Sequence, residues 1–170
     1  MESKSFDDAL VYLTESLEMK RERFGAVDNL SIAVTMENLA KCQCNRDQDG
    51  KLDPREYVEQ ALEIKKGSLG HKIGDNAGIA KTLSMAGHVF LKTGDSVKAE
   101  KFCRDSLKMT KILFGNNHPT LVEILVCLGQ SLVNQGKQYE ADDCFQKALD
   151  VAIRQQNPDL KDIVERLSKG

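Results

Sequence analysis

The residues best suited to chemistry in this sequence are oxygen-bearing side chains that alternate along one short acidic stretch. Counted from its first residue, they fall at positions 1, 3, 5, 9 and 12, with a glycine at position 6 and an apolar residue at position 8. The residues that would supply oxygen ligands, one of them through its backbone carbonyl, are Asn45, Asp47, Asp49, Lys51, Asp53 and Glu56. Because Ca²⁺ takes six to eight hard oxygen ligands, alternate side chains must point inward while the glycine permits a sharp turn. The spacing predicts a calcium site within residues 45–56.

This stretch resembles the twelve-residue calcium loop of the EF-hand, which lies between two helices. The resemblance implies that Glu56 closes the site with two oxygens and that Asp53 binds directly or through water. A second interpretation is open, because Asp53 can cap a helix whose first residue is Pro54. Capping accounts for Asp53 and Glu56 but leaves the two earlier aspartates unexplained. The stretch is therefore either a calcium site that fixes the angle between its flanking helices or an inert acidic turn.

The other reactive side chains form no recognisable catalytic or metal motif. Cys42 and Cys44 have no second pair or histidine at the spacing of a zinc site, and the three histidines are isolated. No serine or cysteine stands with a histidine and an acid in a nucleophile motif. The odd number of five cysteines indicates reduced thiols. We expect a non-enzymatic protein of the cytoplasm or the nucleus.

Length and charge narrow the class of partner. The chain has 170 residues, and its 24 basic and 26 acidic residues give a net charge of −2. This balance provides no field that would recruit a nucleic acid or an anionic membrane surface. No run approaches the ~20 apolar residues of a membrane span. A protein or peptide partner is expected instead.

The elements that position these residues come from an internal repeat. Anchor leucines separated by 45, 45 and 42 residues stand at Leu17, Leu62, Leu107 and Leu149. Between them lie helices marked by a small residue with apolar neighbours at helical spacing, and these small residues are Ala40, Gly87 and Gly129. Two helices that cross closely need small side chains at the contact. The repeat therefore predicts alternating helices that pack as pairs.

The pattern predicts eight helices and no strand in a single domain over residues 1–170. They cover residues 5–24, 29–44, 54–68, 76–93, 96–113, 119–134, 138–155 and 159–168. The last is a partial copy of the helix that begins at Pro119. The chain thus starts with the second helix of one unit and ends within the first helix of another. Two interpretations follow: a piece of a longer protein, or a domain closed by half-repeats.

The small-residue and Ala-Leu positions resemble those of the tetratricopeptide repeat. The 42-residue spacing, with the segments Phe114–Pro119 and Gln135–Ala141, is similar to the kinesin-light-chain type. The resemblance implies an all-α, right-handed superhelical solenoid of antiparallel helix hairpins. It also implies a protein-interaction scaffold whose concave groove is lined by the first helix of each pair. The family hosts many tasks, so the resemblance predicts the fold more sharply than the function.

The repeat register assigns residues to this groove. The expected peptide-binding residues are Asn38, Lys41, Lys81, Met85, His88, Lys92, Val126, Gln130 and Asn134, with Val34, Glu37, Ser84, Glu123 and Cys127 beside them. Because the middle helix is basic, we expect an acidic or polar peptide with apolar anchors near Met85 and Val126. The alternatives are that these residues form only a solvated helix face, or that the protein is a calcium-independent cargo adaptor.

Overall fold

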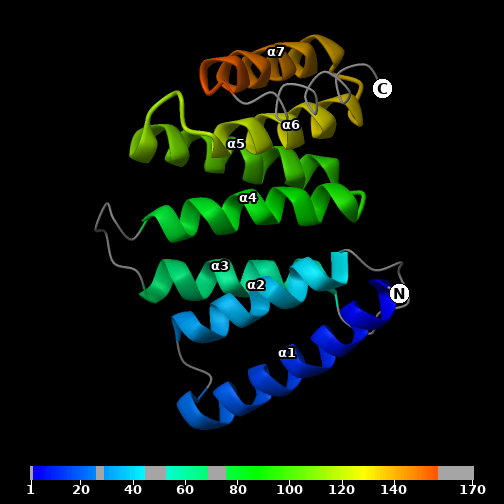
Figure 1. Ribbon diagram of the computed structural model, residues 1–170, viewed down its shortest axis with the longest axis vertical. Coiled ribbons are helices and arrows are strands. Elements are labelled where there is room, and N and C mark those ends of the chain that lie inside the picture. Colours follow the sequence, from blue (N-terminus) through cyan, green and yellow to red (C-terminus); the bar gives the residue numbers. More distant parts are fainter. Residues whose placement is uncertain (1, 26–28, 45–52, 69–75, 157–170) are drawn as a thin grey trace.

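The computed structural model describes residues 2–25, 29–44, 53–68 and 76–156, with the backbone alone for residues 2–7 (Figure 1). This part of the chain contains helices and no strand. The helices are α1 (Glu2–Phe24), α2 (Leu30–Cys44), α3 (Pro54–Ser68), α4 (Asn76–Lys92), α5 (Ser96–Phe114), α6 (Thr120–Val133) and α7 (Gln138–Arg154). Each begins and ends within three residues of its predicted bounds. The eighth predicted helix, residues 159–168, lies outside the described residues.

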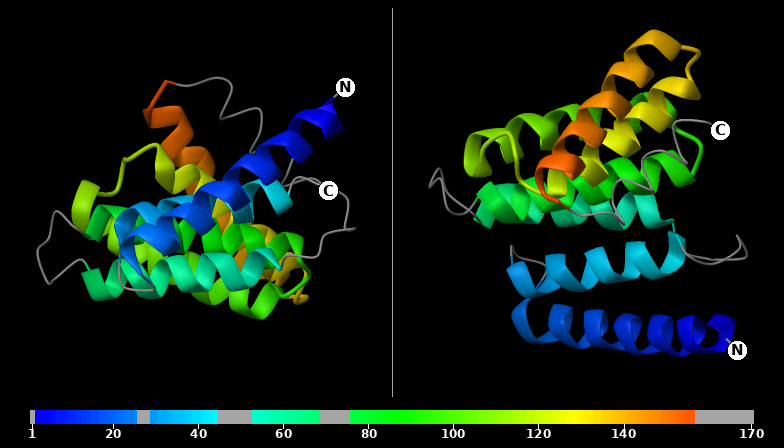
Figure 2. Two further views of the ribbon diagram at one scale, coloured as in Figure 1. Left: turned by 90° about the horizontal axis from the view of Figure 1, so that it is seen from below. Right: turned by 45° about the horizontal axis from the view of Figure 1, so that its top comes forward.

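The helices form a stack of antiparallel pairs. The hairpins α2–α3, α4–α5 and α6–α7 lie on one another in chain order, and α1 packs against α2 (Figure 1). Figure 2 shows the stack from two further sides, with α7 at the opposite end from α1. The first helices of successive hairpins also touch, α2 with α4 and α4 with α6. The architecture is the predicted all-α solenoid of helix hairpins, and its first helices share one face.

Glycines stand where the two helices of a hairpin cross most closely. A Cβ atom built on Gly129 of α6 would lie 2.6 Å from the Phe145 ring of α7. One built on Gly87 of α4 would collide with the Cys103 sulfur of α5. Real Cβ contacts are longer than these, so larger side chains would force the helices apart. The predicted role of the small residues in helix packing is confirmed at both sites.

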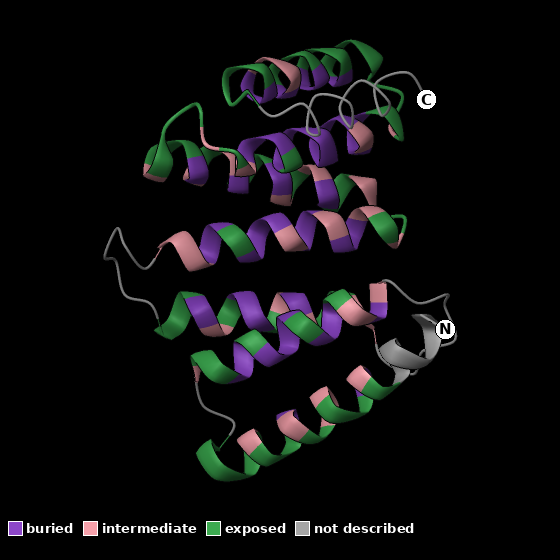
Figure 3. Cartoon of the chain, in the orientation of Figure 1, coloured by how far each residue is buried: buried purple, intermediate pink, exposed green. Residues whose placement is uncertain are grey.

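The buried residues of each helix form a stripe that faces its neighbours (Figure 3). Leu17 and Leu62 are buried, while Leu107 and Leu149 are partly buried and pack against the core around α6 and α7. Side chains of adjacent hairpins share this core: Ala40 and Val58, for example, cluster with residues of α4 and α5. No hairpin hides its apolar stripe alone, so the stack stabilises itself through contacts between neighbours.

A buried ion pair within the first hairpin is linked to the second hairpin by a threonine. Lys65 Nζ of α3 lies 2.5 Å from Glu37 Oε1 of α2, and their side chains are 7% and 6% exposed. Thr82 of α4 completes the network, because its hydroxyl bonds to Glu37 and accepts a hydrogen bond of 3.0 Å from Lys65. Glu37 was expected in the groove, and this expectation is wrong. Its carboxylate points into the stack, where a lysine and a hydroxyl satisfy it.

A second polar network fastens α5 to the turn before α7. The Glu100 carboxylate accepts hydrogen bonds from Arg104, Gln135 and Lys137 at 2.8–2.9 Å. Partial burial raises the pKa of Glu100, but these hydrogen bonds outweigh that effect and lower it to about 2. The ionised carboxylate is therefore part of the folded structure at neutral pH.

Candidate functional site

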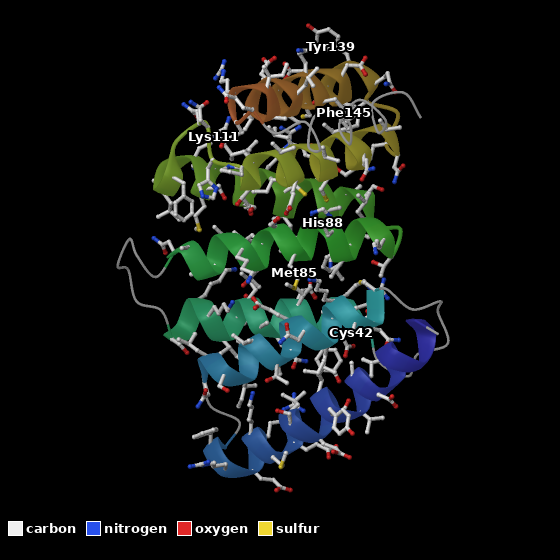
Figure 4. The ribbon with its side chains drawn as sticks, in the orientation of Figure 1. Cys42, Met85, His88, Lys111, Tyr139 and Phe145 are labelled. Atoms are coloured by element: carbon white, nitrogen blue, oxygen red, sulfur yellow. The ribbon has the colours of Figure 1, made fainter. Side chains whose placement is uncertain are left out.

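A cavity of about 600 Å³ opens on the face shared by the first helices. Its walls come from α2, α4 and α6, and from the end of α5 with the turn that follows it. The lining residues are Lys41, Cys44, Ala77, Ala80, Lys81, Ser84, Met85, His88, Val89, Lys92, Thr110, Phe114, His118, Thr120 and Glu123. Figure 4 shows Met85 and His88 on α4, in the middle of the stack. A volume of this size falls within the range of protein ligand sites.

The cavity is positively charged although the whole chain carries a net charge of −2. Three lysines, Lys41, Lys81 and Lys92, face one acid, Glu123, which gives the lining a formal charge of 3 − 1 = +2. Lys92 Nζ lies 3.5 Å from the Cys44 carbonyl oxygen. Lys41 and Lys81 are exposed and have no hydrogen-bond or ion-pair partner among the described residues. Two exposed ammonium groups in one cavity attract anionic groups of a partner.

Apolar surface lies between these charges. Met85 and Val89 of α4 are among the residues that line the cavity. At one end the Phe114 ring is 47% exposed and stacks on the His118 ring, with centroids 4.6 Å apart. The backbone amide of Thr120 donates a hydrogen bond to His118 Nδ1 at 3.4 Å, which orients the imidazole. The cavity can therefore hold an apolar side chain beside an acidic one.

Three cysteines lie behind the cavity, on the side away from solvent. Cys103, Cys127 and Cys144 come from α5, α6 and α7 and belong to one buried cluster. The hydrogen bond with Cys127 raises the pKa of His88, whose ring lines the cavity. Hydrogen bonds from Cys103 and from His88 lower the pKa of Cys127, against the effect of burial. The same pairing and burial raise the pKa of Cys103, so the thiolate of this pair resides on Cys127.

Five of the nine residues expected in the groove line the cavity. They are Lys41, Lys81, Met85, His88 and Lys92. The basic middle helix thus occupies the position that the register predicted. The last turn of α2 contributes Lys41, as expected.

The other four expected residues lie elsewhere. Asn38 is exposed on α2 outside the cavity, and Gln130 is half-buried on α6. Asn134 ends α6, where its side-chain amide donates a hydrogen bond of 3.2 Å to Ser96 Oγ. Val126 was expected as an apolar anchor, but it is only 8% exposed and packs with Leu121 and Val151 in the core. Cys127, expected beside it, is also fully buried.

Sequence reasoning missed the aromatic end of the cavity. Phe114 and His118 lie at the end of α5 and in the following turn, rather than on a first helix. The segment Phe114–Pro119 was noted as a repeat feature and a helix stop, and Gly115 does end α5 with a φ of 80°. The signal that could have identified the site was the pair of rings four residues apart on either side of that stop.

The acidic stretch is described only at its end. Asn45, Asp47, Asp49 and Lys51 lie outside the described residues. Asp53 precedes α3 and accepts a hydrogen bond of 2.9 Å from the backbone amide of Arg55, whose guanidinium group also binds the same carboxylate. The capping interpretation is therefore confirmed for Asp53, while Glu56 is exposed in the first turn of α3. The described residues contain no group of three or more His, Cys, Asp or Glu that could hold a metal ion, and calcium binding by residues 45–56 stays a prediction.

Comparison with known proteins identifies the class of fold. Residues 78–154, which include most of α4 and all of α5, α6 and α7, match the family model of the tetratricopeptide repeat. The match covers less than half of the chain, and the stacked hairpins have the fold of an all-α, tetratricopeptide-repeat-like solenoid. No curated protein matches the chain. Of the helices in the described ranges, none has the length and apolarity needed to cross a membrane.

Proposed function

We propose that this protein is an interaction scaffold that binds an extended acidic peptide in the cavity between α2, α4 and α6. The observation that carries the proposal is the pair of exposed lysines, Lys41 and Lys81, which have no ion-pair partner among the described residues and line the same cavity as Met85 and Phe114. A tetratricopeptide solenoid supports this role, because its first helices present one continuous face to a partner. The segment Phe114–Pro119 further supports a repeat of the kinesin-light-chain type.

The binding mode follows from the lining. Acidic side chains of the peptide contact Lys41 and Lys81, while one apolar side chain packs against Met85 and the exposed face of Phe114. The charges set the orientation and speed of association, and they are weakened by salt. The buried apolar side chain supplies the part of the affinity that salt leaves unchanged.

Fluorescence anisotropy with two labelled peptides tests the proposal. Both peptides have about ten residues and a single central leucine; one carries glutamates and aspartates, and the other carries lysines at the same positions. The variant Lys41→Glu/Lys81→Glu changes the formal charge of the lining from +2 to −2. We expect the acidic peptide to bind the wild type and to lose at least about tenfold in affinity with this variant.

A matched variant controls for net charge. Lys101 and Lys108 are exposed on α5 and do not line the cavity. The variant Lys101→Glu/Lys108→Glu changes the charge of the chain equally and should bind the acidic peptide as the wild type does. Equal loss in both variants, or equal binding of the two peptides, would contradict the proposal.

We further propose that Ca²⁺ bound by residues 45–56 adjusts one edge of this cavity. The acidic stretch follows directly in the sequence on a helix end that lines the cavity. Lys41 and Cys44, in the last turn of α2, are among the lining residues, and residue 45 comes next. Calorimetric titration of Ca²⁺ into the wild type and Asp47→Ala tests it. The Asp53 carboxylate is held by Arg55, so Arg55→Ala should increase the affinity for Ca²⁺. Absence of heat in the wild type and in Arg55→Ala would refute calcium binding and leave the peptide proposal standing.

A further inference from the structure

The three buried cysteines behind the cavity are not needed for peptide binding. Their sulfur atoms come from three successive helices and meet in one cluster with Ile124, Leu128 and Phe145. Cys103 and Cys127 have no exposed surface, and Cys144 is 7% exposed. Buried cysteines usually behave as small apolar residues. This cluster differs, because a histidine reaches it from the solvent side.

His88 connects the cluster to the cavity. Its imidazole lines the cavity and interacts with Cys127, which raises the pKa of His88 and lowers that of Cys127. The preceding residue, Gly87, lies against the Cys103 sulfur, so α4 packs tightly around this point. Glu123 of α6 raises the pKa of the same imidazole, and Lys92 of α4 lowers it. A protonated imidazole beside a thiol is the arrangement that favours the thiolate, which is the reactive form of cysteine.

Cys103 is placed to respond to a change at Cys127. The two residues belong to the same buried cluster, and their interaction raises the pKa of Cys103 and lowers that of Cys127. A disulfide has an S–S bond of about 2 Å and needs neighbouring backbones, which adjacent helices of the stack provide. Cys144 is in the same cluster, but burial, and then the nearby Asp143 carboxylate, raise the pKa of its thiol. The cluster thus contains one reactive thiol, one resolving thiol and one inert thiol.

We propose that Cys103 and Cys127 form an oxidation site at which hydrogen peroxide joins α5 to α6 through a disulfide. In the first step the Cys127 thiolate attacks one peroxide oxygen, the O–O bond breaks, and the released hydroxide takes a proton to become water. Cys127 is then a sulfenic acid. In the second step the Cys103 sulfur attacks the Cys127 sulfur, the S–O bond breaks, and the Cys103 proton leaves with the hydroxyl group as a second water. The two sulfurs together lose two electrons, and one peroxide gains them.

The small size of peroxide suits the position of the pair. A water-sized oxidant can pass His88 from the cavity, whereas a bulky aromatic disulfide reagent cannot reach a fully buried sulfur. Peroxide should therefore oxidise Cys103 and Cys127, whereas the larger reagent should leave both thiols unreacted. In the reverse direction, a dithiol reductant would restore both thiols.

Mass spectrometry of the intact, folded protein tests the proposal. The background variant Cys42→Ser/Cys44→Ser removes the two half-buried thiols, which lie outside the cluster. After peroxide treatment and alkylation, we expect a loss of two hydrogen atoms and a single cross-linked peptide containing Cys103 and Cys127. A cross-link to Cys144, oxidation of Cys144 alone, or both Cys103 and Cys127 remaining free after treatment would overturn the inference.

Two further variants test the separate roles of His88 and Cys103 in the oxidation. In the same background, His88→Ala should slow the oxidation of Cys127 about tenfold, because less thiolate is present. Cys103→Ala should leave Cys127 as a sulfenic acid instead of a disulfide. This product adds one oxygen atom to the intact mass, and a dimedone probe added together with denaturant traps it. Circular dichroism confirms that each variant is folded before the reaction is measured. An unchanged rate in His88→Ala would contradict the assigned role of the imidazole, and lack of trapping in Cys103→Ala would contradict the two-step reaction.

Discussion

The buried pair between Glu37 and Lys65 allows a quantitative test of how the hairpins are held together. Both side chains are less than 10% exposed, and Thr82 of the next hairpin bonds to each of them. Replacing Lys65 with Met leaves the Glu37 carboxylate buried with one hydroxyl partner. Replacing Glu37 with Leu leaves the Lys65 ammonium in the same position. Each single change removes the counterion of a buried charge, which costs about 3–5 kcal/mol.

The double variant should behave differently. With Glu37→Leu and Lys65→Met together, no charge is left at this site, and the Thr82 hydroxyl is free to donate to the Gly78 carbonyl oxygen, which lies 2.8 Å away. Apolar replacement of both partners of a buried ion pair is often neutral or stabilising. We therefore expect the double variant to lie within about 1 kcal/mol of the wild type, far from the sum of the single effects.

Urea unfolding followed by far-ultraviolet circular dichroism measures these differences. For a loss of about 4 kcal/mol and a slope of about 2 kcal/mol/M, each single variant should unfold at about 2 M less urea. The exposed pair Lys147 and Asp143, one helical turn apart on α7, provides the control. Lys147→Met should cost no more than about 0.5 kcal/mol. Single variants at Glu37 and Lys65 that resemble this control, or a double variant as unstable as the sum, would refute the reasoning.

Three further predictions concern other contacts of the stack. Gly129→Val should destabilise the protein by about 1–3 kcal/mol in urea unfolding, because the added side chain collides with Phe145; wild-type stability would contradict the close crossing. The folded-state pKa of Glu100 is lowered from 4.5 to about 2. Its ionised carboxylate therefore contributes fully to the free energy of unfolding above pH 4.5, and this contribution is lost as the pH falls towards 2. Because its charged partners Arg104 and Lys137 are solvent-exposed, we expect the stability difference between the wild type and Glu100→Gln to shrink by only about 1–2 kcal/mol over that interval. A difference independent of pH would oppose this account. Asp53→Ala should lower the free energy of unfolding by about 1 kcal/mol, measured by thermal melting, since the first turn of α3 loses its cap; an unchanged melting temperature would contradict the capping role.

The helices could be predicted because the repeat restates the same local signals several times. Anchor leucines appear at matching positions in successive repeat units, so their agreement predicts where the helices lie. The repeated small residues likewise predicted where the two helices of a hairpin cross closely, and Gly87 and Gly129 lie at these crossings. These features depend on contacts within a hairpin, which the register describes directly.

The cavity was only partly predictable because its boundary depends on contacts between hairpins. Glu37 and Val126 occupy register positions at the border between the groove and the core. Glu37 turned inward because Lys65 of its own hairpin and Thr82 of the next hairpin, 28 and 45 residues away, bond to its carboxylate, and no repeat signal marks these partners. Phe114 and His118 reach the cavity from a turn, and the register of first helices does not include turns.

Photo-crosslinking of a bound acidic peptide tests the central claim most directly. A peptide of about ten residues, with glutamates around one central benzophenone-alanine, is irradiated with the full-length protein, and the linked site is mapped by mass spectrometry. We predict a link at Met85 or elsewhere in the lining formed by α4 and the end of α5, which a tenfold excess of unlabelled acidic peptide abolishes. Links confined to α1, α3 or α7, or links that excess peptide does not reduce, would contradict binding in the basic cavity.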